Sequence, residues 1–185
     1  MNAKDLLGKK IIDKKARDLA KLAEINLNTK TLEISNIYGS MGNPLSKKYI
    51  DIPVSKIFAV GDYIQISETI EDMEDKKLDK IPEAEQGVVK LNNFLGKTIL
   101  DCQGNIAGKV SDVEIDADSN KILSILLEGS SSGFGRPKDQ KTVKIEDISS
   151  IGDYIIINKV FTEEEETSEE DDKKEEKESV NVNIE

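Results

Sequence analysis

The segment LGKKIID, residues 7–13, returns 88 residues later as LGKTILD, residues 95–101. Two further pairs of segments match in the same order along the chain: residues 24–27 with 112–115, again at a spacing of 88, and residues 60–64 with 151–155, at a spacing of 91. Three ordered matches indicate an internal duplication, in which the second copy has gained three residues between its landmarks.

Each copy is patterned as short strands separated by turns. In the second copy, residues 109–115 alternate polar and apolar, residues 121–128 form a β-branched apolar run, and residues 154–157 form a further apolar strand. Regular turn signals between short strands favour a small barrel or sandwich. In the first copy, residues 17–23 have helix propensity, but the match with the second copy predicts a strand there.

The charge is concentrated at the end of the chain. Residues 162–185 hold 12 acids and 3 lysines, a net of −9, so the remaining residues carry only −2 of the total of −11. We expect this acidic segment to be disordered, because it has too few apolar residues to offset its ordering entropy. The near-neutral body argues against nucleic acid as a ligand.

Residues 69–91 are charged, contain Pro82 and Gly87, and are expected to be a linker with a short exposed helix near residues 71–78.

Composition indicates a reducing environment. Cys102 is the sole cysteine, the opening ten residues lack a secretory apolar region, and no stretch approaches the 20 or so apolar residues of a membrane span. We therefore expect a cytoplasmic protein without direct membrane insertion.

Catalytic chemistry is poorly supported by the residues present. The chain has no histidine, which excludes the usual Ser-His and Cys-His pairs, and an acid neighbours Cys102, which disfavours a reactive thiolate. Residues 116–120 start like a calcium loop, but Lys121 and Leu127 stand where that loop needs Gly and Glu, so a hairpin turn is expected. Residues 129–137 lack the phosphate-binding pattern and are expected to be a hairpin connection. We predict no catalytic residue, no cofactor and no metal; an enzyme would need an acid pair such as Asp112 and Asp116 in a cleft.

Six residues are candidates for partner binding: Tyr63, Tyr154, Arg136, Val180, Val182 and Ile184. The two tyrosines hold equivalent places in the two copies, and packing in the core or at a strand edge is the alternative role for them. Arg136 stands in the Gly-bearing loop. The last three alternate with polar residues at the end of the acidic segment, a pattern that can pair with a sheet edge on another barrel or a partner. A purely solvating role for the whole acidic segment stays open.

The second copy resembles the PRC-barrel family of small β-barrels. The resemblance rests on residues 95–97, Gly104, residues 108–116 and residues 148–157, which look like the opening, second strand and closing strand of that family. The first copy keeps residues 7–9, 52–54 and 61–64, but has Ala16 and Ala20 where the second copy has Gly104 and Gly108.

The resemblance implies an all-β fold with two tandem small PRC-type β-barrels. The expected divisions are a first barrel at residues 1–68, a charged linker at 69–91, a second barrel at 92–161 and a disordered acidic tail at 162–185. Among family members, free-standing proteins similar to archaeal cell division protein B work with SepF and FtsZ, which implies a non-enzymatic adaptor with SepF-like or FtsZ-like partners. The alternative is a ribosome or RNA maturation accessory protein. The two copies could pack as an internal pseudo-dimer, and the chain could also form a homodimer.

Overall fold

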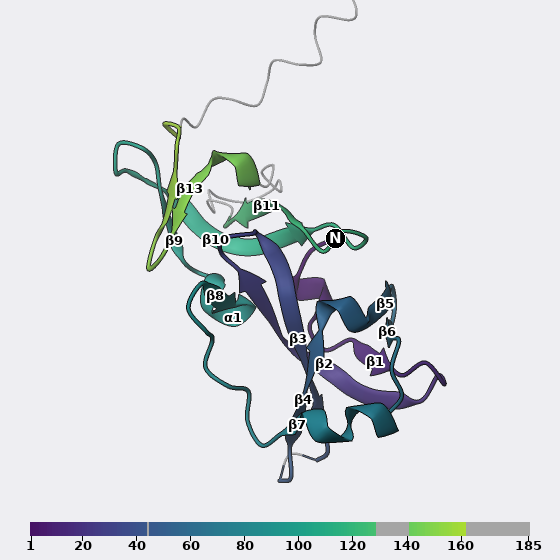
Figure 1. Ribbon diagram of the computed structural model, residues 1–185. Coiled ribbons are helices and arrows are strands. Elements are labelled where there is room, and N and C mark those ends of the chain that lie inside the picture. The colour runs from purple at the N-terminus through teal and green to yellow at the C-terminus, as the bar shows by residue number, and fades with distance from the viewer. Residues whose placement is uncertain (44, 129–140, 162–185) are drawn as a thin grey trace, which may run out of the picture.

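The computed structural model describes residues 1–43, 45–128 and 141–161 (Figure 1). We call residues 1–87 the first half and residues 88–161 the second half. The first half contains the strands β1 Lys10–Ile12, β2 Asp18–Asn28, β3 Glu33–Met41, β4 Lys48–Pro53, β5 Ile57–Val60, β6 Ile64–Ile66 and β7 Lys77–Leu78, with 3-10 turns η1 Lys4–Leu6, η2 Val54–Lys56 and η3 Glu71–Lys76. The second half contains β8 Val88–Lys90, α1 Leu91–Phe94, β9 Thr98–Leu100, β10 Ile106–Ile115, β11 Ile122–Leu127, β12 Thr142–Lys144, η4 Ile145–Asp147, β13 Ile148–Ile151 and β14 Ile155–Ile157.

The described strands form two sheets with one shared strand order. The first runs β5-β6-β1-β2-β3-β4-β7, with β8 paired to β2, and the second runs β13-β14-β9-β10-β11-β12. Within each sheet the pairings β1–β6 and β9–β14 are parallel, and the others are antiparallel. The all-β prediction is confirmed. The strand pairings of neither sheet close into a barrel in these residues, so the structure supports two β-rich halves rather than two closed barrels.

The segment at residues 17–23 lies almost entirely within β2. Burial explains why packing overrides helix propensity there: Leu19, Leu22 and Ile25 are buried, and the strand pairs with β1, β3 and β8. Residues 69–91, expected to be a linker, contribute η3, β7 and β8, and both of these strands join the first sheet. Residues 129–140 and 162–185, including the hairpin connection and the acidic tail, lie outside the described residues.

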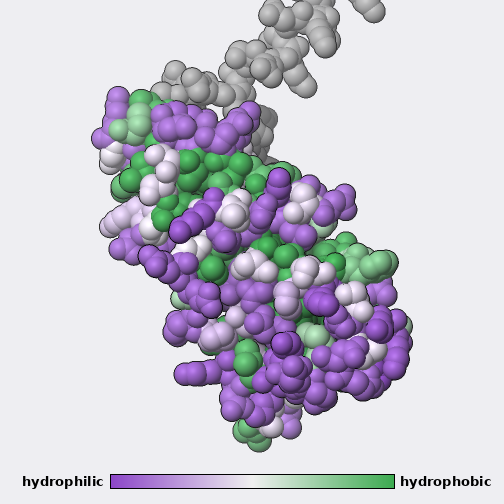
Figure 2. Space-filling view, in the orientation of Figure 1, coloured by the Kyte–Doolittle hydropathy of each residue, from purple (hydrophilic) through white to green (hydrophobic). Residues whose placement is uncertain are grey.

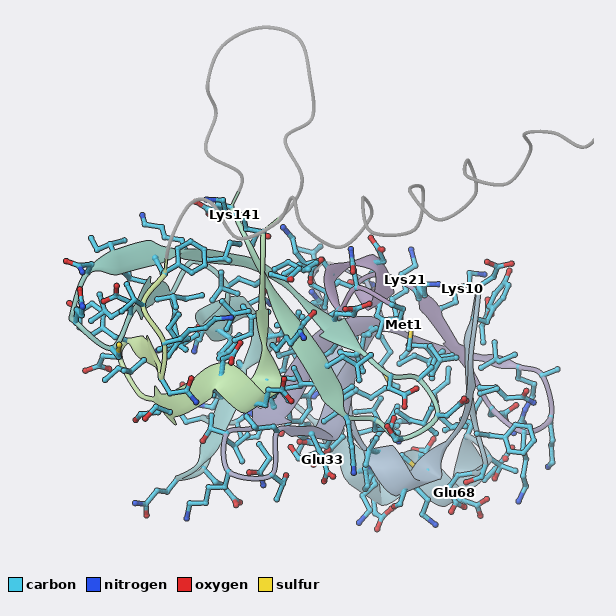
Figure 3. All side chains as sticks on the ribbon, turned by 90° about the horizontal axis from the view of Figure 1, so that it is seen from above. Met1, Lys10, Lys21, Glu33, Glu68 and Lys141 are labelled. Atoms are coloured by element: carbon cyan, nitrogen blue, oxygen red, sulfur yellow. The ribbon has the colours of Figure 1, made fainter. Side chains whose placement is uncertain are left out.

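The contacts between the two halves are reciprocal. Asn2 of the first half bridges to Glu114 on β10, and Lys90 of the second half pairs with Asn26 on β2, with both members of the pair displaced by 88 residues. The hairpin ends meet in the same way: the Ile34 N–H donates to the Asn120 carbonyl at 2.9 Å, and the Ile122 N–H donates to the Leu32 carbonyl at 2.9 Å. In Figure 3, Met1 and Glu33 lie at the boundary between the halves.

A single cluster of buried apolar side chains spans this boundary. It includes Ile25 and Ile50 of the first half together with Val113 and Ile125 of the second, all fully buried. Because apolar burial is the main favourable contribution to folding, the two halves share their principal source of stability. Among the described residues, no helix is long and apolar enough to cross a bilayer.

Candidate interaction surface

Tyr63 and Tyr154 occupy equivalent tight turns, between β5 and β6 and between β13 and β14. In each turn the tyrosine carbonyl accepts a hydrogen bond from a glycine N–H, that of Gly61 at 3.0 Å and that of Gly152 at 2.8 Å. Lys9 and Lys97, which are also equivalent, reach the same turns and donate to the Gly61 and Gly152 carbonyls. The tyrosines are 50% and 56% exposed, so neither is a core residue.

The surface beside Tyr154 is apolar. Tyr154 directly precedes β14, and Ile156 is the middle residue of that strand. Ile156 is the register partner of Leu100 on β9, and Leu100 is the partner of Ile106 on β10. Since side chains at paired positions share a face, Ile106, Leu100 and Ile156 form one row across three strands. We call these three residues with Tyr154 the apolar row.

The apolar row is open to solvent. Ile106 is 74% exposed and Ile156 is 41% exposed, and Leu100 is partly buried. Neighbouring apolar residues on β14 behave differently, because Ile155 and Ile157 point the other way and are fully buried. Exposed aliphatic side chains grouped around an exposed tyrosine are typical of a protein-binding surface.

The first half presents a polar version of the same row. Asp18 stands in place of Ile106, Ile12 in place of Leu100, and Gln65 in place of Ile156, and the register partners are the same. Asp18 also forms an ion pair with Lys10 at 2.8 Å. The first half also exposes two aromatic residues, Tyr63 and Phe58, and Phe58 lies in the bulge of β5 between Ile57 and Ala59, the register partners of Ile66 and Gln65. On the face seen in Figure 2, hydrophobic residues form a broad band over the second half, whereas the first half is mostly hydrophilic.

Sequence reasoning selected Tyr154 but missed its three neighbours. Arg136, Val180, Val182 and Ile184 lie outside the described residues, so their placement stays a prediction. The signal for the missing residues was available in the two repeat spacings, because 88 and 91 align Asp18 with Ile106 and Gln65 with Ile156. An apolar residue in one copy opposite a polar residue in the other indicates a position outside the packing that the two copies share.

The acids considered for chemistry are engaged by the surrounding backbone and side chains. Asp112 is buried, and its Oδ1 accepts the Lys4 N–H at 3.0 Å and the Val113 N–H at 2.8 Å. Asp116 lies at the β10–β11 turn, where the Ser119 hydroxyl and the Asp118 N–H donate to it and lower its carboxyl pKa. In the parts of the chain that the structure describes, no three His, Cys, Asp or Glu residues gather into a potential metal site.

The turn between β10 and β11, which starts like a calcium loop, serves as a hairpin connection. Asn120 has a left-handed backbone with φ of +58°, and the Asp116 N–H donates to the Lys121 carbonyl at 2.9 Å, which closes the hairpin. Cys102 is exposed in the turn that follows β9. Neither of these turns offers a site for chemistry, and the apolar row is the candidate interaction site that the exposed residues of the second half support.

The comparisons with known proteins bear on the half that carries this row. No curated protein matches the chain. Residues 86–162, which include the apolar row and every strand from β8 to β14, match the family model of the PRC-barrel domain.

Proposed function

We propose that this protein is a non-enzymatic adaptor for protein–protein interaction, in which two PRC-type modules pack within one chain as an internal pseudo-dimer. The family match to the second half supports one module. The shared strand order of the two sheets and the reciprocal contacts at a spacing of 88 support the second.

The apolar row carries the proposal. An internal pseudo-dimer of identical modules would present two equivalent surfaces, but here one row is apolar and the other holds Asp18 and Gln65. We infer from this difference that the second half binds a protein partner through the row, whereas the first half stabilises the second half. The apolar side chains supply the buried area, and Tyr154 supplies an aromatic anchor.

The absence of histidine from the sequence and the hydrogen bonds that hold Asp112 to the backbone support a non-enzymatic role. The proposed setting is the cytoplasm of an archaeal cell, in a division assembly with SepF-like or FtsZ-like proteins. This setting rests on the family resemblance of the motifs in both halves, and the row rests on the geometry.

The test is affinity capture from extract of the native organism, with the full chain as bait and mass spectrometry of the retained proteins. The decisive variant is Ile106→Asp with Ile156→Gln, which copies the polar residues of the first half into the row. Because both side chains are exposed, the fold should be retained. We expect SepF-like or FtsZ-like proteins to be retained by the native chain and their recovery to fall about tenfold with the variant.

A matched control changes the first half at the equivalent positions, Asp18→Asn with Gln65→Ser, and should leave recovery unchanged. Equal loss with both variants, or no loss with either, would contradict the role of the row. Recovery of ribosomal proteins and RNA in place of division proteins would replace the division setting with ribosome or RNA maturation.

A further inference from the structure

The last described residues lie near the end of β9, the strand that carries Leu100, the central residue of the row. The Phe161 N–H donates to Asp101 Oδ2 at 3.5 Å, and Asp101 directly follows Leu100 in the sequence. Lys141 Nζ lies 5.3 Å from the centre of the Phe161 ring. The chain beyond Phe161 therefore starts near the end of β9, and the acidic run at residues 163–166 follows within a few residues of this lysine contact.

The remaining chain is long enough to return to the row. Residues 162–179 separate Phe161 from the apolar tip, which we define as residues 180–184. A random coil of this length would have an end-to-end distance of about 20–25 Å, and its fully extended reach would be about 60 Å. The row itself crosses two interstrand spacings, about 10 Å. The number of connecting residues is therefore sufficient for the tip to reach any part of the row.

The tip is chemically suited to this surface. Val180, Val182 and Ile184 alternate with Asn181 and Asn183, so an extended tip would present three apolar side chains on one side and two amides on the other. These three side chains would span about 13 Å, close to the length of the row. Apart from this tip, the segment from residue 162 to 185 contains no apolar residue.

From this arrangement we infer that the apolar tip, residues 180–184, occupies the apolar row of its own chain. Attachment through residues 162–179 gives the tip an effective concentration near the row on the order of millimolar, so that a weak apolar contact is populated. The inference concerns the same row as the proposed function and rests on it: a partner that binds the row must displace the tip. Covering the row also removes exposed aliphatic surface from the partner-free protein.

The experiment compares amide NMR spectra of the full chain and of the full-length variant Val180→Ser, Val182→Ser, Ile184→Ser. We expect the largest shift differences at Leu100, Ile106, Tyr154 and Ile156, and we expect them to be independent of protein concentration. The matched control, Asn181→Ser with Asn183→Ser, keeps the apolar side chains and should leave the row signals as in the native chain. A second variant, Ile106→Asp with Ile156→Gln, should release the tip and sharpen its signals.

A synthetic peptide of residues 176–185 gives the affinity. It should shift the same row signals of the triple-serine variant, and its apparent affinity for the native chain should be about two- to tenfold weaker because the tip competes. Unchanged row signals in the triple-serine variant would overturn the inference, as would shifts at another surface. Shifts that grow with protein concentration would assign the row to the tip of a second copy and also overturn it. Because these readouts need no partner, they are independent of the outcome of the capture experiment.

Discussion

At the scale of single residues, one buried carboxylate organises the first turn of each half. Asp13 accepts the N–H groups of Lys15 and Arg17, and Asp101 accepts those of Gln103 and Asn105. Asp13 also accepts the N–H of Ile70, which follows β6, and Asp101 also accepts the N–H of Phe161, which follows β14. The halves differ in one partner, because Arg17 places a guanidinium on Asp13, at 2.6 and 2.9 Å, where Asn105 offers an amide.

The same turn shows what the sequence could not predict. Ala16 stands where the second copy has Gly104, yet Ala16 adopts the same left-handed backbone, with φ of +59° beside +84°. In the sequence, Ala16 counted as a departure of the first copy from the second, because glycine is the residue that adopts this conformation without steric cost. The structure shows that the turn keeps its backbone shape with alanine in this position.

A second substitution is compensated across the sheet. Gly108 faces Leu127, whose Cδ2 would lie 2.6 Å from a Cβ added to that glycine. The equivalent close approach in the first half joins Ala20 and Gly39, where a Cβ on Gly39 would lie 2.7 Å from the Cβ of Ala20. The small residue has moved from one strand to its neighbour. Both changes are visible in the sequence, but only the packing of β2 against β3 shows that one change compensates for the other.

Acid should weaken the first half through Asp13. Burial opposes ionisation of Asp13, but the hydrogen bonds from the Arg17 side chain and from the backbone of Arg17, Ile70 and Lys15 outweigh it and lower the pKa to about 2. An unfolded aspartate titrates near pH ~4. The stabilisation is therefore complete above about pH 4 and is lost as the pH falls from about 4 towards 2. The urea concentration at the unfolding midpoint should fall as the pH is lowered from about 5 to 2, and it should fall less steeply for Asp13→Asn than for the native protein.

The exposed turn carboxylate Asp62 provides the control for this pH series. Asp62→Asn should keep the native pH dependence, because Asp62 lies exposed outside the Asp13–Arg17 network. Equal slopes for native protein and Asp13→Asn would show that Asp13 gains no proton-linked stability from its partners.

At the scale of elements, two short helical turns are each held by a carboxylate from the opposite half. Glu24 lies at a bulge of β2 and accepts the N–H of Asn92 in α1, together with its side-chain amide at 2.8 Å. Asp112 lies at the equivalent bulge of β10 and accepts the N–H of Lys4 in η1 at 3.0 Å. Each carboxylate also accepts the N–H of the residue that follows it.

Sequence patterns could not reveal this exchange. Residues 24–27 and 112–115 were recognised as equivalent strands, but a strand pattern does not say which segment covers it. Residues 88–92 were assigned to a linker and the start of the next module, whereas β8 at residues 88–90 pairs with the sheet of the first half. Local periodicity predicts the strand itself, whereas its partner depends on contacts between residues far apart in the chain.

Removing either carboxylate should destabilise the protein. In Glu24→Ala or Asp112→Ala, two backbone N–H groups lose their acceptor, at a cost of about 1–3 kcal/mol in the free energy of unfolding. Glu24→Gln and Asp112→Asn keep an acceptor oxygen and should cost less than half as much. Urea denaturation at neutral pH measures both. If each alanine variant were no less stable than its amide counterpart, the capping role would be wrong.

At the scale of the whole molecule, the exchanged segments tie the halves into one unit. The first four residues lie against β10, β8 and α1 lie against β2, and the β2–β3 and β10–β11 hairpins meet at Leu32 and Asn120. The buried cluster includes side chains from both halves. Residues 69–91, expected to be a linker, are therefore not a separate connecting segment, because their strands β7 and β8 belong to the first sheet.

This connection predicts a single unfolding transition. The chain has no tryptophan, so Tyr63→Trp and Tyr154→Trp, made separately at exposed equivalent turns, provide a fluorescence probe in each half. Both probes should report the same urea midpoint. Ile125→Ala removes a fully buried side chain from the second half and should lower the stability reported by both probes by about 2–5 kcal/mol.

The two probes also decide what the first half can do for the apolar row. Suppose that Ile125→Ala lowers the urea midpoint only at the Tyr154→Trp probe. Each half would then fold on its own, the exchanged segments would only dock, and the first half could not stabilise the half that carries the row. Equal shifts would mean that any partner bound at the row stabilises the whole chain, including the half that the partner does not touch, because binding to the native state alone raises the stability of every part that unfolds with it.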